Sequence, residues 1–192
     1  MYSTSDFRKG LKIELDGKPN EVVDFLHVKP GKGGAFVRTK LKNLVTGNVI
    51  DRTFRSSEKV GIPDLKQRKM QYLYNAEGKF YFMDQETYEQ ISLDAEQLGD
   101  NRGFLHDGIV VDMLFHNDQP ITVELPIFVE IPVSSTNPGV RGDTASGGSK
   151  PATLKTGAVI NVPLFVEEGD ILKIDTRTRG YIERVSKGDR NL

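Results

Sequence analysis

The sequence has no cysteine among its 192 residues and only three histidines, His27, His106 and His116. The absence of cysteine excludes a disulfide framework, a thiol nucleophile and a thiolate metal site. The histidines are scattered, and none belongs to the His-Glu-x-x-His spacing that binds zinc. We therefore expect neither a metal nor a cofactor.

Long apolar runs and an excess of one charge are also missing. Lysine and arginine number 26 and aspartate and glutamate 27, so net charge alone predicts no binding to a polyanion. Apolar runs such as Gly108–Val111 are too short to cross a bilayer. The first residues, Met-Tyr-Ser-Thr-Ser-Asp, lack the basic and apolar regions of a signal peptide. We expect a cytoplasmic protein that does not bind a membrane.

Residues that could form a catalytic site are absent as well. Gly31-Lys32-Gly33-Gly34 shares glycines and a lysine with phosphate-binding loops, but the spacing, the hydroxyl residue and the following helix of that motif are missing. No combination of nucleophile, base and oxyanion site is apparent. The sequence predicts a binding protein without catalytic residues.

Short strands separated by turn signals dominate the pattern and predict an all-β protein. Residues 1–63 form a first unit, typical of a small SH3-like barrel, with strands expected at Lys12–Leu15, Glu21–Val28, Ala35–Leu41 and Val49–Phe54. Residues 64–126 form a second unit, in which two strands, short helical turns and two further strands indicate an OB-type barrel. Pro126 precedes a third unit, residues 127–192.

The third unit contains a strand with a proline and a long polar segment. Pro132 should restrict the strand Ile127–Val133 to an edge or a bulge, because proline has no N–H for a sheet ladder. Residues 134–151 are rich in Gly, Ser, Thr, Asn and Pro and are predicted to form one long loop, a length that is usually functional or disordered.

The stretch from His27 to Ala35 has one lysine, Lys32, between flexible glycines. Pro30 biases Lys29 toward extended geometry, and Gly31, Gly33 and Gly34 tolerate positive φ. With strands expected on both sides, the pattern predicts a hairpin that exposes Lys32 at its tip. An ordinary solvated hairpin end is the alternative interpretation, because glycine and proline mark most turns.

The charges are distributed unevenly along the chain. Residues 1–63 carry 12 basic and 7 acidic residues, residues 64–126 carry 5 and 12, and residues 127–192 carry 9 and 8. A basic cluster of this kind suits phosphate contacts, whereas the acidic middle unit should face away from nucleic acid or toward a basic protein. Simple solvation of surface strands is the alternative. The cluster in and beside the predicted hairpin consists of Lys29, Lys32, Arg38, Lys40 and Lys42.

Several segments together resemble the bacterial elongation factor P family over essentially the whole chain. They are Lys29–Ala35, Gln71–Tyr74, Phe82–Asp84, Glu86–Gln90, and above all Pro138–Thr144 with its continuation through Ser146–Leu154, Thr156–Val159 and Val162–Val166.

The resemblance implies an SH3-like (KOW-like) domain followed by two OB domains in an L-shaped, tRNA-like arrangement. It implies a monomer that binds the ribosome beside the peptidyl-tRNA, stimulates peptide-bond formation and relieves stalls at consecutive prolines. In this family the loop lysine that maps onto Lys32 is often extended by a modifying enzyme. The tip residues that would contact tRNA or ribosome include Pro30. The Gly-Asp-Thr loop, here Gly142, Asp143 and Thr144, would lie near the messenger RNA in the exit site.

A general single-stranded nucleic-acid-binding protein built on OB barrels is the competing hypothesis. Such a protein stacks bases on aromatic side chains of an exposed basic surface. Here the aromatic-rich middle unit is acidic, which argues against this hypothesis.

Overall fold

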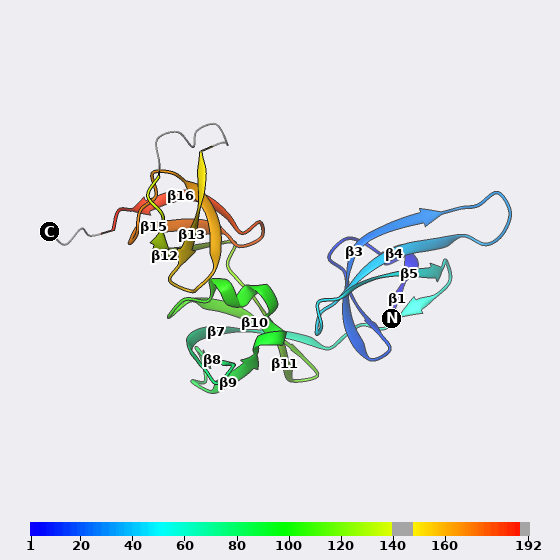
Figure 1. The fold of residues 1–192 in the computed structure, drawn as a ribbon. Helices are drawn as coiled ribbons and strands as arrows, with labels where there is room; N and C mark the ends of the chain where they lie inside the picture. Colours follow the sequence, from blue (N-terminus) through cyan, green and yellow to red (C-terminus); the bar gives the residue numbers. More distant parts are fainter. Residues whose placement is uncertain (140–147, 189–192) are drawn as a thin grey trace. The chain divides into compact units, whose positions relative to one another are not determined.

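A computed structural model describes residues 1–139 and 148–188, and nearly all of their regular structure is β (Figure 1). Short helices occur only between strands in this part of the chain: η1 (Thr4–Asp6), α1 (Ala95–Leu98) and η2 (Gly99–Phe104). The strands are β1 (Tyr2–Ser3), β2 (Lys12–Leu15), β3 (Lys18–Val28), β4 (Phe36–Asn43), β5 (Val49–Arg55), β6 (Lys59–Val60), β7 (Leu65–Ala76), β8 (Lys79–Asp84), β9 (Gln90–Asp94), β10 (Val110–His116), β11 (Gln119–Glu124), β12 (Phe128–Thr136), β13 (Ser149–Leu154), β14 (Val159–Pro163), β15 (Ile171–Asp175) and β16 (Gly180–Ser186).

The first sheet has the order β2-β3-β4-β5, and β1 pairs separately with β6. Buried and exposed residues alternate along its strands, because successive side chains of a strand point to opposite faces. Phe7 and Phe54 meet edge to face in this core with ring centroids 5.3 Å apart. The buried members are Phe7, Leu11, Ile13, Val22, Val37, Leu41, Phe54 and Val60.

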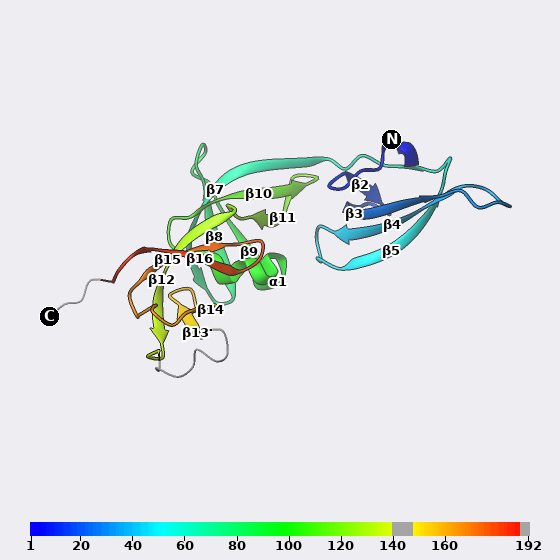
Figure 2. The same ribbon diagram turned by 90° about the horizontal axis from the view of Figure 1, so that it is seen from above.

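The second sheet has the order β11-β10-β7-β8-β9. Strand β7 begins at Leu65, next to the expected start of the second unit at residue 64, and runs through the segment Gln71–Tyr74. Helices α1 and η2 occupy the segment between β9 and β10, where the sequence predicts short helical turns (Figure 2).

The third sheet has the order β14-β13-β12-β15-β16, so β12 is its central strand. The expectation of an edge or bulge position holds at Pro132 itself, which has a register partner in β15 alone and precedes a bulge at Val133/Ser135, although β12 as a whole is not an edge strand. Proline is tolerated because β12 changes partners at this point: residues up to Pro132 pair with β15, and residues from Val133 pair with β13. The expected loop 134–151 is also too long, because β12 extends to Thr136 and β13 begins at Ser149.

The elements belong to two compact units. The first comprises Met1–Arg68, Leu93–Gly99 and Met113–Thr122, and the second comprises Lys69–Ser92, Asp100–Asp112 and Val123–Leu192. The division into domains at residues 63 and 126 stays a prediction. Among the described residues, no helix has the length and apolar character needed to span a bilayer.

Candidate functional site

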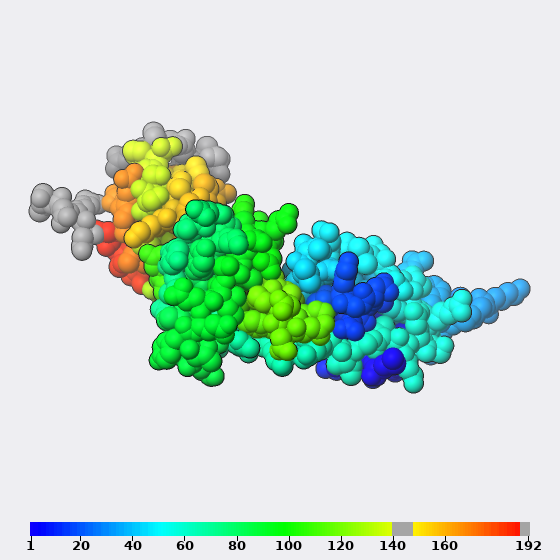
Figure 3. Space-filling view, turned by 90° about the horizontal axis from the view of Figure 1, so that it is seen from below, coloured from blue at the N-terminus to red at the C-terminus, as the bar shows by residue number. Residues whose placement is uncertain are grey.

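The hairpin formed by β3 and β4 carries the predicted tip. Residues 29–35 connect the two strands, and Gly33 has a φ of 102°, in the left-handed region that glycine tolerates best. Lys29, Pro30 and Lys32 are all exposed. In the space-filling view this connection forms a narrow projection beyond the sheet of its own unit (Figure 3).

Backbone pairing holds the two arms together up to the tip. The ladder between β3 and β4 continues to the pair Val28–Phe36, and the backbone N–H of Ser56 donates to the carbonyl of Ala35 at 3.1 Å. Phe25 and His27 add an edge-to-face ring contact of 5.6 Å on β3. The arms are therefore fixed by hydrogen bonds along their length, whereas the glycine-rich connection is not.

Lys32 forms no hydrogen bond or ion pair with any described residue. A Cβ placed on Gly31 or Gly34 would meet no atom within 4 Å, so these glycines are not required by close packing. The observed tip is consequently an open loop, and Lys32 is not folded back into its own barrel.

Strand β4 separates its cations from its core residues. Val37 and Leu41 are fully buried, while Arg38, Lys40 and Lys42 are exposed on the opposite face. This alternation agrees with the sequence prediction for Arg38 and Lys40 and extends it to Lys42. The structure thus gathers the predicted cations on one hairpin, with three of them on one sheet face and two in the tip.

A cleft of about 470 Å³ beside this hairpin adds a residue that sequence reasoning missed. Arg52 lies opposite Thr39 in the β4–β5 register and lines the cleft together with Arg38 and Lys40. The buried hydroxyl of Thr39 has no hydrogen-bond partner among the described residues. The sequence did not indicate Arg52, because it is distant in sequence from the hairpin tip.

The predicted Gly-Asp-Thr loop residues Gly142, Asp143 and Thr144 lie outside the described residues. The strands on both sides of this segment are tied together. The Nζ of Lys150, itself buried, donates to the carbonyl of Asn137 at 2.6 Å. The hydroxyl of Thr136 donates to the carbonyl of Pro151 at 2.9 Å.

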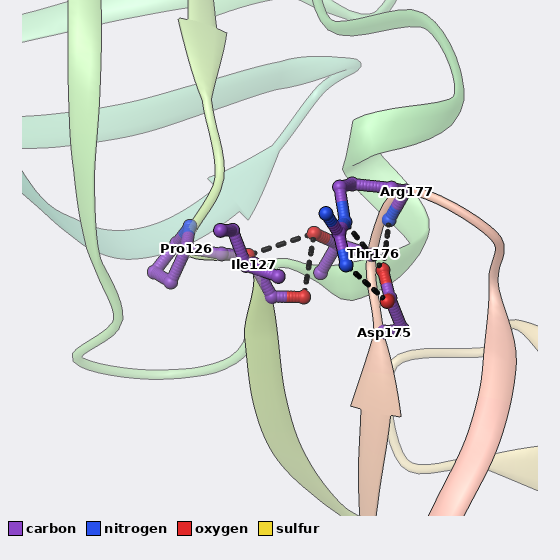
Figure 4. Close-up of polar contacts among 5 residues, drawn as sticks. All are labelled: Pro126, Ile127, Asp175, Thr176 and Arg177. Carbon is purple, nitrogen blue, oxygen red and sulfur yellow. Dashed lines mark hydrogen bonds and ion pairs between the residues drawn. The ribbon is translucent and has the colours of Figure 1, made fainter.

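A polar cluster at the end of β15 is also outside the sequence prediction (Figure 4). Thr176 donates from its backbone N–H to the carbonyl of Ile127 and from its hydroxyl to the carbonyl of Pro126, at 2.9 and 2.7 Å. Arg177 hydrogen bonds to the carboxylate of Asp175, which lowers the pKa of Asp175 to about 2. The cluster attaches the start of β12 to the end of β15 and is a structural feature of the third sheet. In the sequence, the only sign of this cluster is the run Asp175-Thr176-Arg177.

No group of three or more His, Asp or Glu side chains is arranged to hold a metal ion within the described ranges. The arrangement offers cations on an extended hairpin, which suit contacts to phosphate.

Comparisons with known proteins cover nearly the whole chain. Residues 3–60 match the model of the elongation factor P (EF-P) KOW-like domain, residues 65–123 the EF-P OB domain, and residues 129–184 the elongation factor P C-terminal domain. Together with the strands described above, these matches confirm the predicted all-β class with an SH3-like, KOW-type first domain and OB domains.

Relatives named "Elongation factor P" are similar over their full length. The protein of Natranaerobius thermophilus is 55% identical over 189 residues, 98% of this chain and 100% of the relative. That of Moorella thermoacetica is 58% identical over 184 residues, 96% of this chain and 100% of the relative. Among solved structures, eukaryotic translation initiation factor 5A from Methanococcus jannaschii is similar with a TM-score of 0.55 and 26% identity, covering 65% of this chain and 91% of that one.

Proposed function

The chain belongs to the elongation factor P family and is a translation elongation factor. From this we propose that Lys32 is the residue that acts on the peptidyl-tRNA. The factor binds the ribosome beside the peptidyl-tRNA and places Lys32 near the acceptor end of that tRNA. It thereby stimulates peptide-bond formation and relieves stalls at consecutive prolines. The observation that carries this proposal is the exposed, unpaired Lys32 at the end of a hydrogen-bonded hairpin.

Positioning alone explains how such a factor accelerates the reaction. Proline is a poor acceptor, because its ring restricts the geometry of approach. Holding the reacting end of the peptidyl-tRNA in line lowers the entropic part of the barrier, and no bond chemistry by the protein is needed. The factor accordingly needs no catalytic residues of its own, and we propose in addition that it acts as a monomer in the cytoplasm.

The cations on β4 support the same interaction. Arg38, Lys40 and Lys42 share an exposed face and neutralise phosphates of the tRNA or the ribosome, which releases counterions. The tRNA- and ribosome-binding tip is completed by Lys29, Pro30, Gly31, Gly33 and Gly34.

The loop that contacts messenger RNA in the exit site consists of Gly142, Asp143 and Thr144. The domains divide as residues 1–63, 64–126 and 127–192.

A lysine-modifying enzyme extends Lys32. An unmodified lysine reaches only about 6 Å beyond its Cα, judged from ordinary bond lengths. The open space around Gly31 and Gly34 leaves room for an enzyme to close around the side chain. Intact mass of the protein from its native source, with the added mass mapped by peptide sequencing, tests this step. An unmodified Lys32 in that sample contradicts it.

The decisive experiment is translation of a reporter with consecutive prolines. We expect Lys32→Ala to abolish stall relief and Lys32→Arg to reduce it, because arginine keeps the charge but changes its shape. Lys18→Ala, an exposed lysine at the opposite end of β3, is the matched control and should act like the parent protein. Native-level relief by Lys32→Ala would refute the role of Lys32.

Ribosome binding measured in parallel separates loss of binding from loss of stimulation. The alternative hypothesis of a general single-stranded nucleic-acid binder is not favoured, because the family models and the quoted relatives are all those of elongation factor P.

A further inference from the structure

A second, larger cleft of about 820 Å³ lies within the second compact unit. Its walls come from η2 and the residues after it, from the end of the β7–β8 hairpin, and from the connection between β13 and β14. This size is within the range of ordinary ligand sites, about 300–1,000 Å³. None of the tRNA-, ribosome- or messenger-binding residues expected from the sequence lines it.

The cleft brings together one cation from the acidic middle of the chain and two from residues 127–192. From residue 80 to residue 126, Arg102 is the only lysine or arginine, whereas aspartate and glutamate together number ten. Arg102 lines the cleft together with Lys155 and Arg179. Arg179 is paired with Asp100, but among the described residues neither Arg102 nor Lys155 forms an ion pair. Two exposed cations are therefore available to an external anion.

Apolar side chains and close contacts form the remaining walls. Phe80 is half-buried, and Val159 is 62% exposed. The hydroxyl of Thr156 donates to the carbonyl of Gly103 at 2.6 Å, and a Cβ on Gly103 would lie 3.3 Å from the Cβ of Ala158. These contacts join the two sides of the cleft, so that its shape does not depend on a ligand.

Free cations beside an aromatic ring are the combination that binds a nucleotide, because the cations pair with phosphate and the ring stacks on a base. We propose that this cleft binds one unstacked nucleotide of ribosomal RNA, with its phosphate between Arg102 and Lys155 and its base against Phe80. Asp107, which is exposed in the same cleft, can accept a hydrogen bond from an amino group of the base. The proposal rests on the proposed function, because it requires that the factor binds the ribosome.

The salt dependence of ribosome binding tests the phosphate contact. Each lost phosphate contact lowers the slope of log K against log salt by about one, which a purely structural change does not do. We expect Arg102→Gln and Lys155→Gln each to weaken binding and to lower the slope by about one, and Lys155→Arg to restore both. Lys187→Gln, an exposed lysine of the same unit outside the cleft, is the control. Parent-like slopes in both glutamine variants would overturn the proposal.

A photo-crosslink identifies the occupant. Val159→p-benzoylphenylalanine places a crosslinker at the cleft, and Val185→p-benzoylphenylalanine places one at another exposed position of the same unit. With ribosomes as the probe, we expect position 159 to give an adduct on ribosomal RNA that position 185 does not give. An adduct only on a ribosomal protein would show that an acidic peptide fills the cleft, and no adduct would show that it stays empty.

The two proposals fail in different ways. If Lys32→Ala abolishes stall relief while the cleft variants bind with the parent slope, only the nucleotide site is wrong. If the parent protein does not bind ribosomes at all, the proposed function itself is wrong.

Discussion

Lys32 and Arg177 are two exposed cations, each in a connection between two adjacent strands. Arg177 donates from its backbone N–H, its Nε and its Nη2 to the carboxylate of Asp175, at 2.8, 3.2 and 2.8 Å. Lys32 has no comparable partner among the described residues. The connection that holds Lys32 is built from glycines with open space around them, whereas the turn that holds Arg177 is fixed by hydrogen bonds.

The difference separates a cation that supports the fold from one that is available to a partner. A side chain that is bonded within the protein has already lost rotamer freedom, and its charge is already neutralised. The side chain of Lys32 keeps its rotamer freedom, and its charge stays unpaired until a binding partner contacts it. Changes at the hairpin tip should therefore affect function without affecting stability, and changes in the third sheet should do the opposite.

The largest expected contrast in stability concerns two glycines. A Cβ on Gly139 would lie 2.7 Å from the carbonyl oxygen of Leu164, whereas a Cβ on Gly34 would meet nothing within 4 Å. We expect Gly139→Ala to lower the free energy of unfolding by about 1–3 kcal/mol, the usual cost of overpacking. Gly34→Ala should leave it unchanged or raise it by about 0.4–1 kcal/mol, because alanine restricts the unfolded chain. Urea unfolding measures both, and equal losses in the two variants would remove the contrast.

Much of this contrast could be anticipated from the sequence, because it is local. The strand Lys12–Leu15 has the bounds that its apolar pattern and flanking turns predict. The exposed cations of β4 follow from strand alternation. A lysine between glycines identifies the open tip without any knowledge of the rest of the chain.

Features that depend on distant partners could not be predicted in this way. Strand β13 begins with Ser149, Lys150 and Pro151, which favour a loop locally, yet it pairs with both β12 and β14. Arg52 lines the cleft beside the hairpin although it lies on another strand, far from the tip in sequence. The cleft around Arg102 and Lys155 combines segments more than fifty residues apart.

The next contrast is the pH dependence of the third sheet. The hydrogen bonds from Arg177 hold the pKa of Asp175 at about 2, below its ordinary value of 3.8. A carboxylate whose pKa is lower in the folded state stabilises that state, and the full contribution is present when the pH is above the pKa of the unfolded chain. This contribution is lost as the pH falls from about 4 to about 2. We expect the difference in urea midpoint between the parent protein and Asp175→Asn to be largest at pH 5 and to shrink over that interval.

Glu130→Gln is the matched control for the acid titration. Glu130 is an exposed carboxylate on β12, and it forms no ion pair with any described residue. Its replacement should therefore leave a midpoint difference from the parent protein close to zero between pH 5 and pH 2. A gap for Asp175→Asn that stays constant over the same interval would show that the ion pair with Arg177 does not account for its stabilisation.

The smallest expected effect is at Lys32 itself. Because its side chain contacts no described residue by hydrogen bond or ion pair, Lys32→Ala should change the free energy of unfolding by no more than about 0.5 kcal/mol, as is usual for surface substitutions. The same variant is expected to lose stall relief. One preparation of Lys32→Ala should therefore show parent-like urea unfolding and no activity in the proline reporter. A loss of several kcal/mol would instead mean that Lys32 supports the hairpin, and the difference between Lys32 and Arg177 would then be one of degree.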